Sequence, residues 1–383
     1  MTDNATKSKI PFFDIREDGP VGHARRSRGT MLALREACFS VIPRPLRPLA
    51  GPLDRISRAW LLRCPSPYVE EIAQIAAIAG HPGVWFVNSS YEWGCTTRID
   101  VSPVPTLRRT LDWPFPGLGR HVEIVLQRGP AGAYVNVTWP GAVGVLTAVA
   151  LGRFGAAINQ APLYRRTEST ALLPADFLLN GYETWRHVER WPAAHLLRFV
   201  FDHCETYDEA VTFLTETPIA RPTLFSIVAS QPGQGCLIER TETEAVVHRG
   251  YCSVANDWQP RSSPRSGHWI PRGRYMSEMP ASDVRCAAFD GHGCKAPFDW
   301  VTQPILNKLT RLGVELSPAT GEIRAVGFEQ VPDQENAVPV TDVFEGQLTS
   351  PGPGSPVQFK TLPREARESA KASISSGLDL QGE

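Results

Sequence analysis

The sequence changes its pattern close to Cys95, and this change limits what the chain can fold into. Upstream, residues 31–63 carry short apolar patterns interrupted by prolines, which predicts two or three short helices. A longer helix should follow, because Ser66 can cap its start, Pro67 fits its first turn and Gly80 can end it. Downstream, apolar residues alternate with polar ones, which is typical of β-strands. The chain is therefore expected to join a helical segment to a strand-rich body near Cys95.

The strand-rich body begins with a β-hairpin signal. Residues 121–127 and 134–137 alternate apolar and polar side chains, and Gly129-Pro130 between them favours a turn. Further strands are expected at residues 144–149, 155–159, 224–229, 236–239 and 245–248.

Helices are expected between these strands. Residues 193–203 carry an apolar stripe with helical spacing, and Thr206 with Glu209 forms a capping box that opens a second helix before Pro218. The chain thus runs from strands to helices and back to strands. This order favours two antiparallel sheets packed face to face with helices outside, an α+β fold with four α-β-β-α layers.

Composition excludes several classes of protein. The 383 residues suffice for a large core, and 39 Lys and Arg against 40 Asp and Glu leave a formal charge of -1. No global field therefore favours nucleic acid. A basic stretch from Arg25 to Arg58 is broken by prolines and lacks the aromatic residues of a nucleic-acid platform. We expect it to be a solvated surface, and we expect no nucleic-acid partner.

Export and membrane signals are absent from the pattern. Residues 1–18 contain no apolar run of a signal peptide, and no run approaches the ~18 apolar residues of a spanning helix. A cytoplasmic protein with no membrane span is therefore expected. The arginine-rich residues 259–275 should form an exposed loop. Residues 1–28 are polar, and residues 348–383 are rich in Pro, Gly, Ser and charge, so both ends are expected to be disordered.

The eight cysteines show no metal-binding spacing. There is no CxxC pair, and Cys286 and Cys294 with His292 between them are better explained as loop and core residues than as ligands. Reduced thiols are expected, and neither a metal nor a cofactor is predicted.

Cys95 has a different potential if the chain is cut between Gly94 and Cys95. The new N-terminus would carry a thiol nucleophile and a candidate general base, its own α-amine. An α-amine, with an ordinary pKa of about 7.7–8.0, can accept the thiol proton near neutral pH, whereas a lysine at about 10.4 would need a large shift. An arbitrary cysteine is most often a buried core residue, so the surrounding pattern must support this hypothesis.

That pattern resembles a known family. The matching strings are SPYVEEI at 66–72, YEWGCTT at 91–97, RTLDW at 109–113, GVLT at 144–147, IN at 158–159, VAND at 254–257 and TQPILNKLT at 302–310. In this order they resemble the acid ceramidase and N-acylethanolamine-hydrolysing acid amidase family, and more distantly bile-salt hydrolases and penicillin V acylases. The resemblance covers roughly residues 30 to 330, and the last string points to the ceramidase side.

The resemblance implies the four-layer fold of N-terminal nucleophile hydrolases and a precursor that cleaves itself before Cys95. Cys95 would then attack an amide carbonyl with Arg109 and Asp112 beside it. A guanidinium would stabilise the thiolate, and Asp112 would hold the α-ammonium. Arg98 and Arg108 are alternatives to Arg109, but the three-residue spacing to Asp112 matches the family's Arg-x-x-Asp.

The remaining implied site residues lie further along the chain. The Asn159 backbone N–H and the Asn256 side-chain amide would donate to the oxyanion, each worth ~3 kcal/mol of barrier in comparable sites. Without the resemblance, both would be taken as turn residues at strand ends. An arginine after Asn256 should complete the site, and Arg274 is our prediction with Arg272 as the alternative.

The implied function is that of a self-processing cysteine amidase acting on linear, non-peptide C–N bonds, with fatty-acyl amides as small-molecule substrates. The chain would divide into a disordered N-terminus (1–28), a helical pro-segment (29–94), a hydrolase domain (95–347) and a disordered tail (348–383), and the two fragments should stay associated. Two alternatives remain. One is an acylase or acyltransferase acting on β-lactam or acyl-homoserine-lactone side chains, and the other is an uncut, inactive lipid-binding protein.

Overall fold

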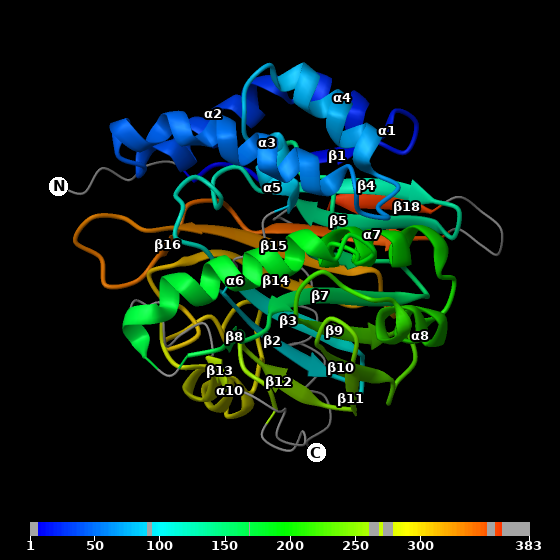
Figure 1. The fold of residues 1–383 in the computed structure, drawn as a ribbon. Helices are drawn as coiled ribbons and strands as arrows, with labels where there is room; N and C mark the ends of the chain where they lie inside the picture. Colours follow the sequence, from blue (N-terminus) through cyan, green and yellow to red (C-terminus); the bar gives the residue numbers. More distant parts are fainter. Residues whose placement is uncertain are drawn as a thin grey trace, which may run out of the picture.

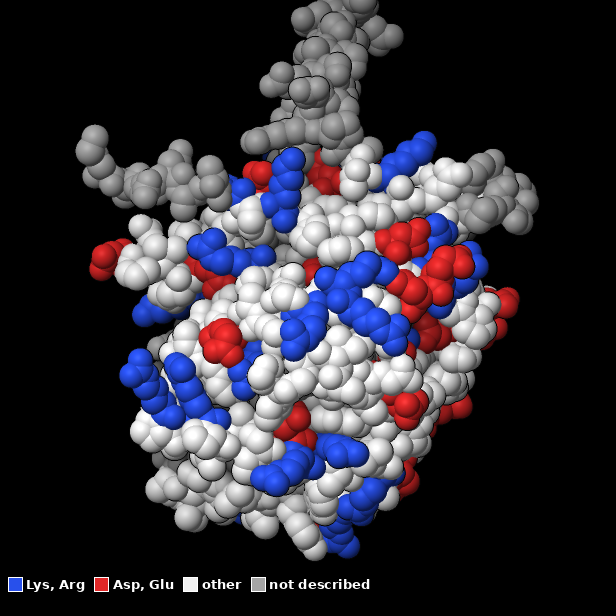
Figure 2. Space-filling view, turned by 90° about the horizontal axis from the view of Figure 1, so that it is seen from above, with Lys and Arg blue, Asp and Glu red and all other residues white. Residues whose placement is uncertain are grey.

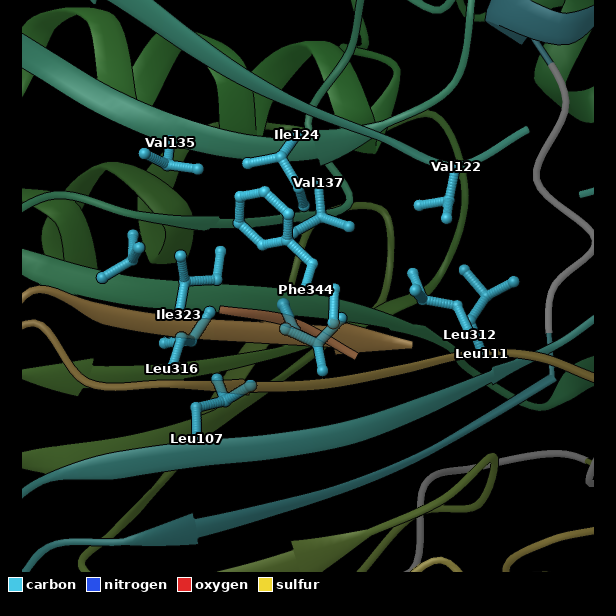
Figure 3. Packing of buried hydrophobic residues seen from close by; sticks show 14 of the residues in the cluster. Leu107, Leu111, Val122, Ile124, Val135, Val137, Leu312, Leu316, Ile323 and Phe344 are labelled. Carbon is cyan, nitrogen blue, oxygen red and sulfur yellow. The ribbon is translucent and has the colours of Figure 1, made fainter. Parts of the chain in front are cut away.

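The chain folds around two β-sheets that pack face to face (Figure 1). The computed structural model describes residues 7–89, 94–167, 169–259, 268–270, 279–350 and 357–361. Leu107 and Leu316 of one sheet meet Ile124 and Val137 of the other in the apolar layer between the sheets (Figure 3). Helices cover the outside of this sandwich, so the predicted α+β class is confirmed.

The first sheet contains eight strands within the described residues. Its order is β1 (Phe12–Asp14), β4 (Glu123–Gly129), β5 (Gly132–Thr138), β6 (Thr147–Val149), β7 (Phe154–Gln160), β9 (Thr223–Ala229), β10 (Gly235–Arg240) and β11 (Ala245–Arg249). All neighbours are antiparallel except β1 and β4, which are parallel. The predicted hairpin is confirmed as β4 and β5, with Glu123 opposite Thr138.

The second sheet also has eight described strands and carries Cys95. Its order is β12 (Cys252–Val254), β2 (Gly94–Asp100), β3 (Thr106–Asp112), β14 (Thr310–Leu316), β15 (Glu322–Glu329), β17 (Phe344–Thr349) and β18 (Gln358–Thr361), with β16 (Val338–Pro339) paired to β15. A separate two-stranded sheet pairs β8 (Leu163–Arg165) with β13 (His268–Ile270). Residues 259–275 were expected to form a loop, and β13 shows that this prediction is wrong for residues 268–270.

Two helices cover the outer face of the first sheet. They are α7 (Ala193–His203) and α8 (Tyr207–Glu216), whose apolar faces pack on residues such as Phe225. The predicted capping box is present, because the Glu209 N–H donates to Thr206 Oγ1 at 3.2 Å and the Thr206 N–H donates to Glu209 Oε2 at 3.2 Å. A 3-10 turn, η2 (Thr170–Leu172), leads into α6 (Leu173–Arg186).

Helix α10 (Ser282–Asp290) and the segment after it lie against the outer face of the second sheet. The indole N–H of Trp300 donates to Glu315 of β14 at 2.6 Å and fixes that segment. Helices therefore lie outside both sheets, which gives the four layers that were predicted.

The helices upstream of Cys95 gather on one side of the sandwich (Figure 1). They are α1 (Gly19–Arg26), α2 (Arg28–Ser40), η1 (Arg44–Leu49), α3 (Ala50–Leu61), α4 (Val69–Ala79) and α5 (Val84–Ser89). Buried polar pairs tie them to the body: the Tyr68 hydroxyl donates to Asp202 at 2.6 Å, and Arg198 donates to Glu71 at 2.7 Å. Gly80 ends α4 with a positive φ of 71°, as predicted.

Ser66 does not cap α4. That helix starts at Val69, and Tyr68 is the residue before it. The Ser66 hydroxyl accepts the Tyr68 N–H at 3.3 Å and also lies 2.9 Å from Nδ1 of His195 on α7, so it has both a local and a tertiary partner.

The expected disorder of both ends is wrong in part. Residues 12–14 form β1 and residues 19–26 form α1, and Thr349 lies within β17. Strand β18 follows at residues 358–361, and Phe359 stacks on Phe12 at 4.4 Å. These polar segments are ordered because an edge strand uses the hydrogen bonds and apolar surface of a sheet built elsewhere in the chain.

Over the side built by the upstream helices, Lys and Arg side chains are scattered with uncharged surface between them (Figure 2). Within the described residues, no helix combines the length and apolar content needed to cross a bilayer. The same residues contain no cluster of three or more His, Cys, Asp or Glu side chains that could hold a metal ion.

Candidate active site

The pairing of β2 with β3 decides which side chains meet Cys95. Cys95 lies opposite Leu111, and Thr97 lies opposite Arg109. Because side chains alternate along a strand, these four residues face the first sheet. Arg98 and Arg108 face the other way and both bind Asp100. Of the three arginines, Arg109 therefore shares the face of Cys95.

The Arg109 guanidinium contacts the thiol directly. Its Nη2 lies 2.7 Å from Cys95 Sγ, and both side chains are completely buried. Its Nη1 donates to Thr147 Oγ1 at 2.6 Å and to the Leu146 carbonyl at 3.1 Å, which fixes its orientation. A positive charge held at this distance stabilises the thiolate form of Cys95.

The other cysteines lie in environments that suppress ionisation. Burial raises the pKa of Cys38 to about 11 and the pKa of Cys64, Cys252 and Cys286 to about 12. Thiols of this kind are inert at neutral pH. The environment of Cys95 differs through its contact with Arg109.

The Asn256 side chain holds the backbone of Cys95. Its Oδ1 accepts the Cys95 N–H at 2.9 Å, and its Nδ2 donates to the Gln160 carbonyl at 2.8 Å. This amide therefore fixes the backbone at Cys95. Its predicted role as an oxyanion donor stays a prediction.

Asn159 lies near the end of β7, across from the strand that carries Cys95. Its Oδ1 accepts from Thr97 Oγ1 at 2.7 Å, and its Nδ2 donates to the Ala255 carbonyl at 3.0 Å. The side chain thus connects β2 to the segment that carries Asn256. The backbone N–H of Asn159, which was predicted to be the oxyanion donor, is not tested by these contacts.

Arg285 on α10 is a site residue that sequence reasoning missed. It is completely buried and donates to the Cys95 carbonyl at 2.8 Å, to Thr96 Oγ1 at 2.9 Å and to Asn256 Oδ1 at 3.0 Å. The predicted Arg274 and its alternative Arg272 lie outside the described residues.

A signal for Arg285 was present in the sequence. The buried positions of α10 are Ser282, Arg285 and Phe289, so the arginine occupies the inward stripe of a short helix. A charged residue at such a position is seldom buried without a partner, which makes it a candidate for a site.

Asp112 ends β3 directly opposite Gly94. Its Oδ1 accepts from Thr310 Oγ1 at 2.8 Å, and its Oδ2 lies 3.5 Å from Arg285 Nη1 without a hydrogen-bond partner among the described residues. A side chain at Gly94 would meet Met279 Sδ at 2.6 Å and Asp112 Cβ at 3.2 Å. A side chain at position 94 would therefore require Met279 to move and would press on Asp112.

An apolar cavity of about 400 Å³ lies between the upstream helices and the body. Upstream residues such as Leu34 and Leu53 line one side, and Trp139 and Leu146 line the other. Leu111, the cross-strand neighbour of Cys95, also lines it. The cavity therefore reaches β3, the strand that pairs with β2 next to Cys95.

The chain is similar in sequence to a known protein. Over 292 residues the chain is 25% identical to acid ceramidase of Bos taurus, a match that covers 67% of this chain and 69% of that protein. The chain is an acid ceramidase homologue. No protein-family model matches it.

Two solved structures are also similar to this acid ceramidase homologue. One is the Caenorhabditis elegans orthologue of N-acylethanolamine-hydrolysing acid amidase, with a TM-score of 0.43, 17% identity and coverage of 62% of this chain and 94% of that one. The other is a variant of conjugated bile acid hydrolase from Clostridium perfringens, with a TM-score of 0.37, 10% identity and coverage of 70% and 96%.

Proposed function

We propose that this acid ceramidase homologue cleaves itself between Gly94 and Cys95 and then hydrolyses fatty-acyl amides through a thioester on Cys95. The observation that carries the proposal is the 2.7 Å contact between Arg109 Nη2 and Cys95 Sγ, made beside a backbone N–H that Asn256 holds. A thiol paired with a buried guanidinium is suited to nucleophilic attack.

The cut would create the general base. The Cys95 N–H that now donates to Asn256 Oδ1 would become an α-amine, and the open Oδ2 of Asp112 can hold it as an ammonium. The amine accepts the thiol proton, and the thiolate attacks the substrate carbonyl. The leaving amine takes that proton as the C–N bond breaks. The α-amine then deprotonates a water molecule, which hydrolyses the thioester.

The cavity supports an apolar acyl group. Its volume of about 400 Å³ lies in the range of small-molecule sites, and its lining is dominated by aliphatic and aromatic residues. Leu111 and Leu146 line the cavity, and the Leu146 carbonyl accepts a hydrogen bond from Arg109. An acyl chain placed there would have its carbonyl end toward Cys95.

Intact-mass analysis tests the cleavage. Two fragments separated between Gly94 and Cys95 are expected for the native chain, and one full-length mass is expected for Cys95→Ala. The matched control is Cys204→Ala, which replaces a buried cysteine on the far side of the first sheet and should still yield both fragments. A native chain that stays single while hydrolysing amides would refute the mechanism.

A substrate series tests the acyl specificity. Ala142 lines the cavity, so Ala142→Phe should fill part of it and raise KM for long acyl chains while leaving short ones unchanged. Equal effects on KM for both chain lengths would show that the acyl chain does not bind in this cavity. Adding an amine acceptor in competition with water separates hydrolysis from acyl transfer.

A further inference from the structure

Arg98 connects three elements that carry residues of the candidate site, which are β2, β12 and α10. It lies on β2, three residues after Cys95, and is paired with Ser253 of β12, the strand that leads into Asn256. Its side chain points away from the nucleophile, toward α10, which carries Arg285. Arg98 contacts no reacting group, so any role in the reaction acts through these elements.

The guanidinium of Arg98 binds the C-terminal end of α10. Its Nη1 donates to the Phe289 carbonyl at 2.7 Å and to the His292 carbonyl at 2.7 Å. The last carbonyls of a helix have no partner within the helix, and an arginine can supply one. Phe289 lies one turn beyond Arg285, about 6 Å along the helix axis.

Neighbouring groups hold Arg98 in this orientation. Asp100 Oδ1 accepts from its Nε at 2.9 Å, and the Tyr251 ring lies 5.1 Å from its guanidinium carbon. The Tyr251 hydroxyl also donates to Asp290 Oδ1 at 2.6 Å, which adds a second contact to the end of α10. The Arg98 guanidinium is thus held in the orientation in which it donates to the end of α10.

We infer that Arg98 is a positioning residue, which fixes α10 on β2 so that Arg285 stays on the Cys95 carbonyl and on Asn256. This inference rests on the proposed amide hydrolysis. Two contacts join α10 to the same face of β2. Arg285 donates to Thr96 Oγ1, and Arg98 donates to the Phe289 carbonyl at the end of the helix. Without the second contact, α10 can tilt about its N-terminal end and withdraw Arg285.

The test compares two arginines that bind helix ends. Arg153 donates to the Phe201 carbonyl at 2.7 Å near the end of α7 and, like Arg98, is half-buried. The end of α7 carries no residue of the site, so Arg153→Gln is a matched control. Kinetic constants are measured per active site, titrated through alkylation of Cys95.

Arg98→Gln should lower kcat by on the order of 10–100-fold, with KM changed by less than about twofold, because a small misplacement of a catalytic group costs this much. Arg153→Gln should keep kcat within about twofold, even if it lowers the urea midpoint as much as Arg98→Gln does. Arg98→Lys keeps the charge but lacks the planar fork of donors, so its kcat should lie between those of wild type and Arg98→Gln. Wild-type kcat in Arg98→Gln, or an equal loss in Arg153→Gln, would overturn the inference.

Hydrogen exchange separates this inference from the proposed function. In Arg98→Gln the backbone amides of α10 should exchange about tenfold faster or more, whereas Arg153→Gln should leave them unchanged. If the wild-type protein hydrolysed no acyl amide, the proposed function would fail, and the exchange data would still decide whether Arg98 holds α10. Unchanged α10 exchange in Arg98→Gln would contradict the inference whatever the activity.

Discussion

Replacing Arg285 with methionine tests the centre of the candidate site. Methionine has a similar length and no charge, so the change removes the donors while keeping much of the volume. Arg285 is fully buried and donates to the Pro280 carbonyl at 3.0 Å, to the Cys95 carbonyl at 2.8 Å, to Thr96 Oγ1 at 2.9 Å and to Asn256 Oδ1 at 3.0 Å. It also lies 3.5 Å from Asp112 Oδ2.

Removing it leaves the Asp112 carboxylate buried without its cation. Breaking one side of a buried ion pair costs about 3–5 kcal/mol, so the free energy of unfolding should fall by that amount. Activity should fall as well, because Cys95 and Asn256 lose the donor that links them. One hydrogen bond to a charged group contributes about 1.5–3 kcal/mol, which corresponds to about 10–100-fold in kcat.

Urea unfolding and single-site kinetics measure the two effects separately. Arg285→Lys retains the charge and should recover part of the stability, because a single ammonium cannot reach all the acceptors. Arg274→Gln is the paired variant, since Arg274 was the arginine predicted from sequence and its place in the site stays a prediction. Full activity in Arg285→Met, or its loss in Arg274→Gln alone, would refute the assignment.

Three further outcomes are expected. Burial lowers the pKa of His195 from 6.5 to about 3, so the unfolded chain takes up this proton below about pH 6.5 and the folded chain does not until about pH 3. The free energy of unfolding should therefore fall by roughly 2–3 kcal/mol between pH 6.5 and 4.5 from this group alone. Urea titrations at several pH values should show that the unfolding free energy of His195→Asn depends less steeply on pH than that of wild type. Iodoacetamide at pH 7 should alkylate Cys95 of the cleaved protein first by peptide mapping, because burial raises the pKa of Cys286 to about 12; equal labelling of both would contradict this. Gly94→Val should slow self-cleavage on the order of tenfold or more in a gel time course, because the new side chain collides with Met279 and Asp112.

Local sequence determined much of the scaffold. The β4–β5 hairpin, helix α7 and the Thr206–Glu209 capping box all follow from residues adjacent in the chain, and each formed as predicted. Their signals, which are apolar periodicity, turn residues and caps, act over a few residues. Such signals are readable without knowledge of the remaining chain.

The Cys95 neighbourhood was partly readable for a related reason. Cys95, Arg109 and Asp112 lie on two adjacent strands of one antiparallel pair, so short spacings bring Arg109 to the face of Cys95 and place Asp112 opposite Gly94. Their prediction as site residues rested on the ordered set of matching strings between residues 66 and 310. The spacing to Asp112 had already favoured Arg109, and the register places that arginine on the same face as the thiol because side chains alternate between faces.

The rest of the site depended on contacts between distant segments. Arg285 reaches Cys95 across 190 positions of sequence, and Asn256 reaches it across 161. Edge strands β1 and β18 likewise form only because a sheet made elsewhere offers them partners. The sequence by itself determined the local elements and predicted Cys95 as the nucleophile. Only the tertiary structure decided which distant cation meets it, because the free energy of a buried charge depends on the partners that folding brings together.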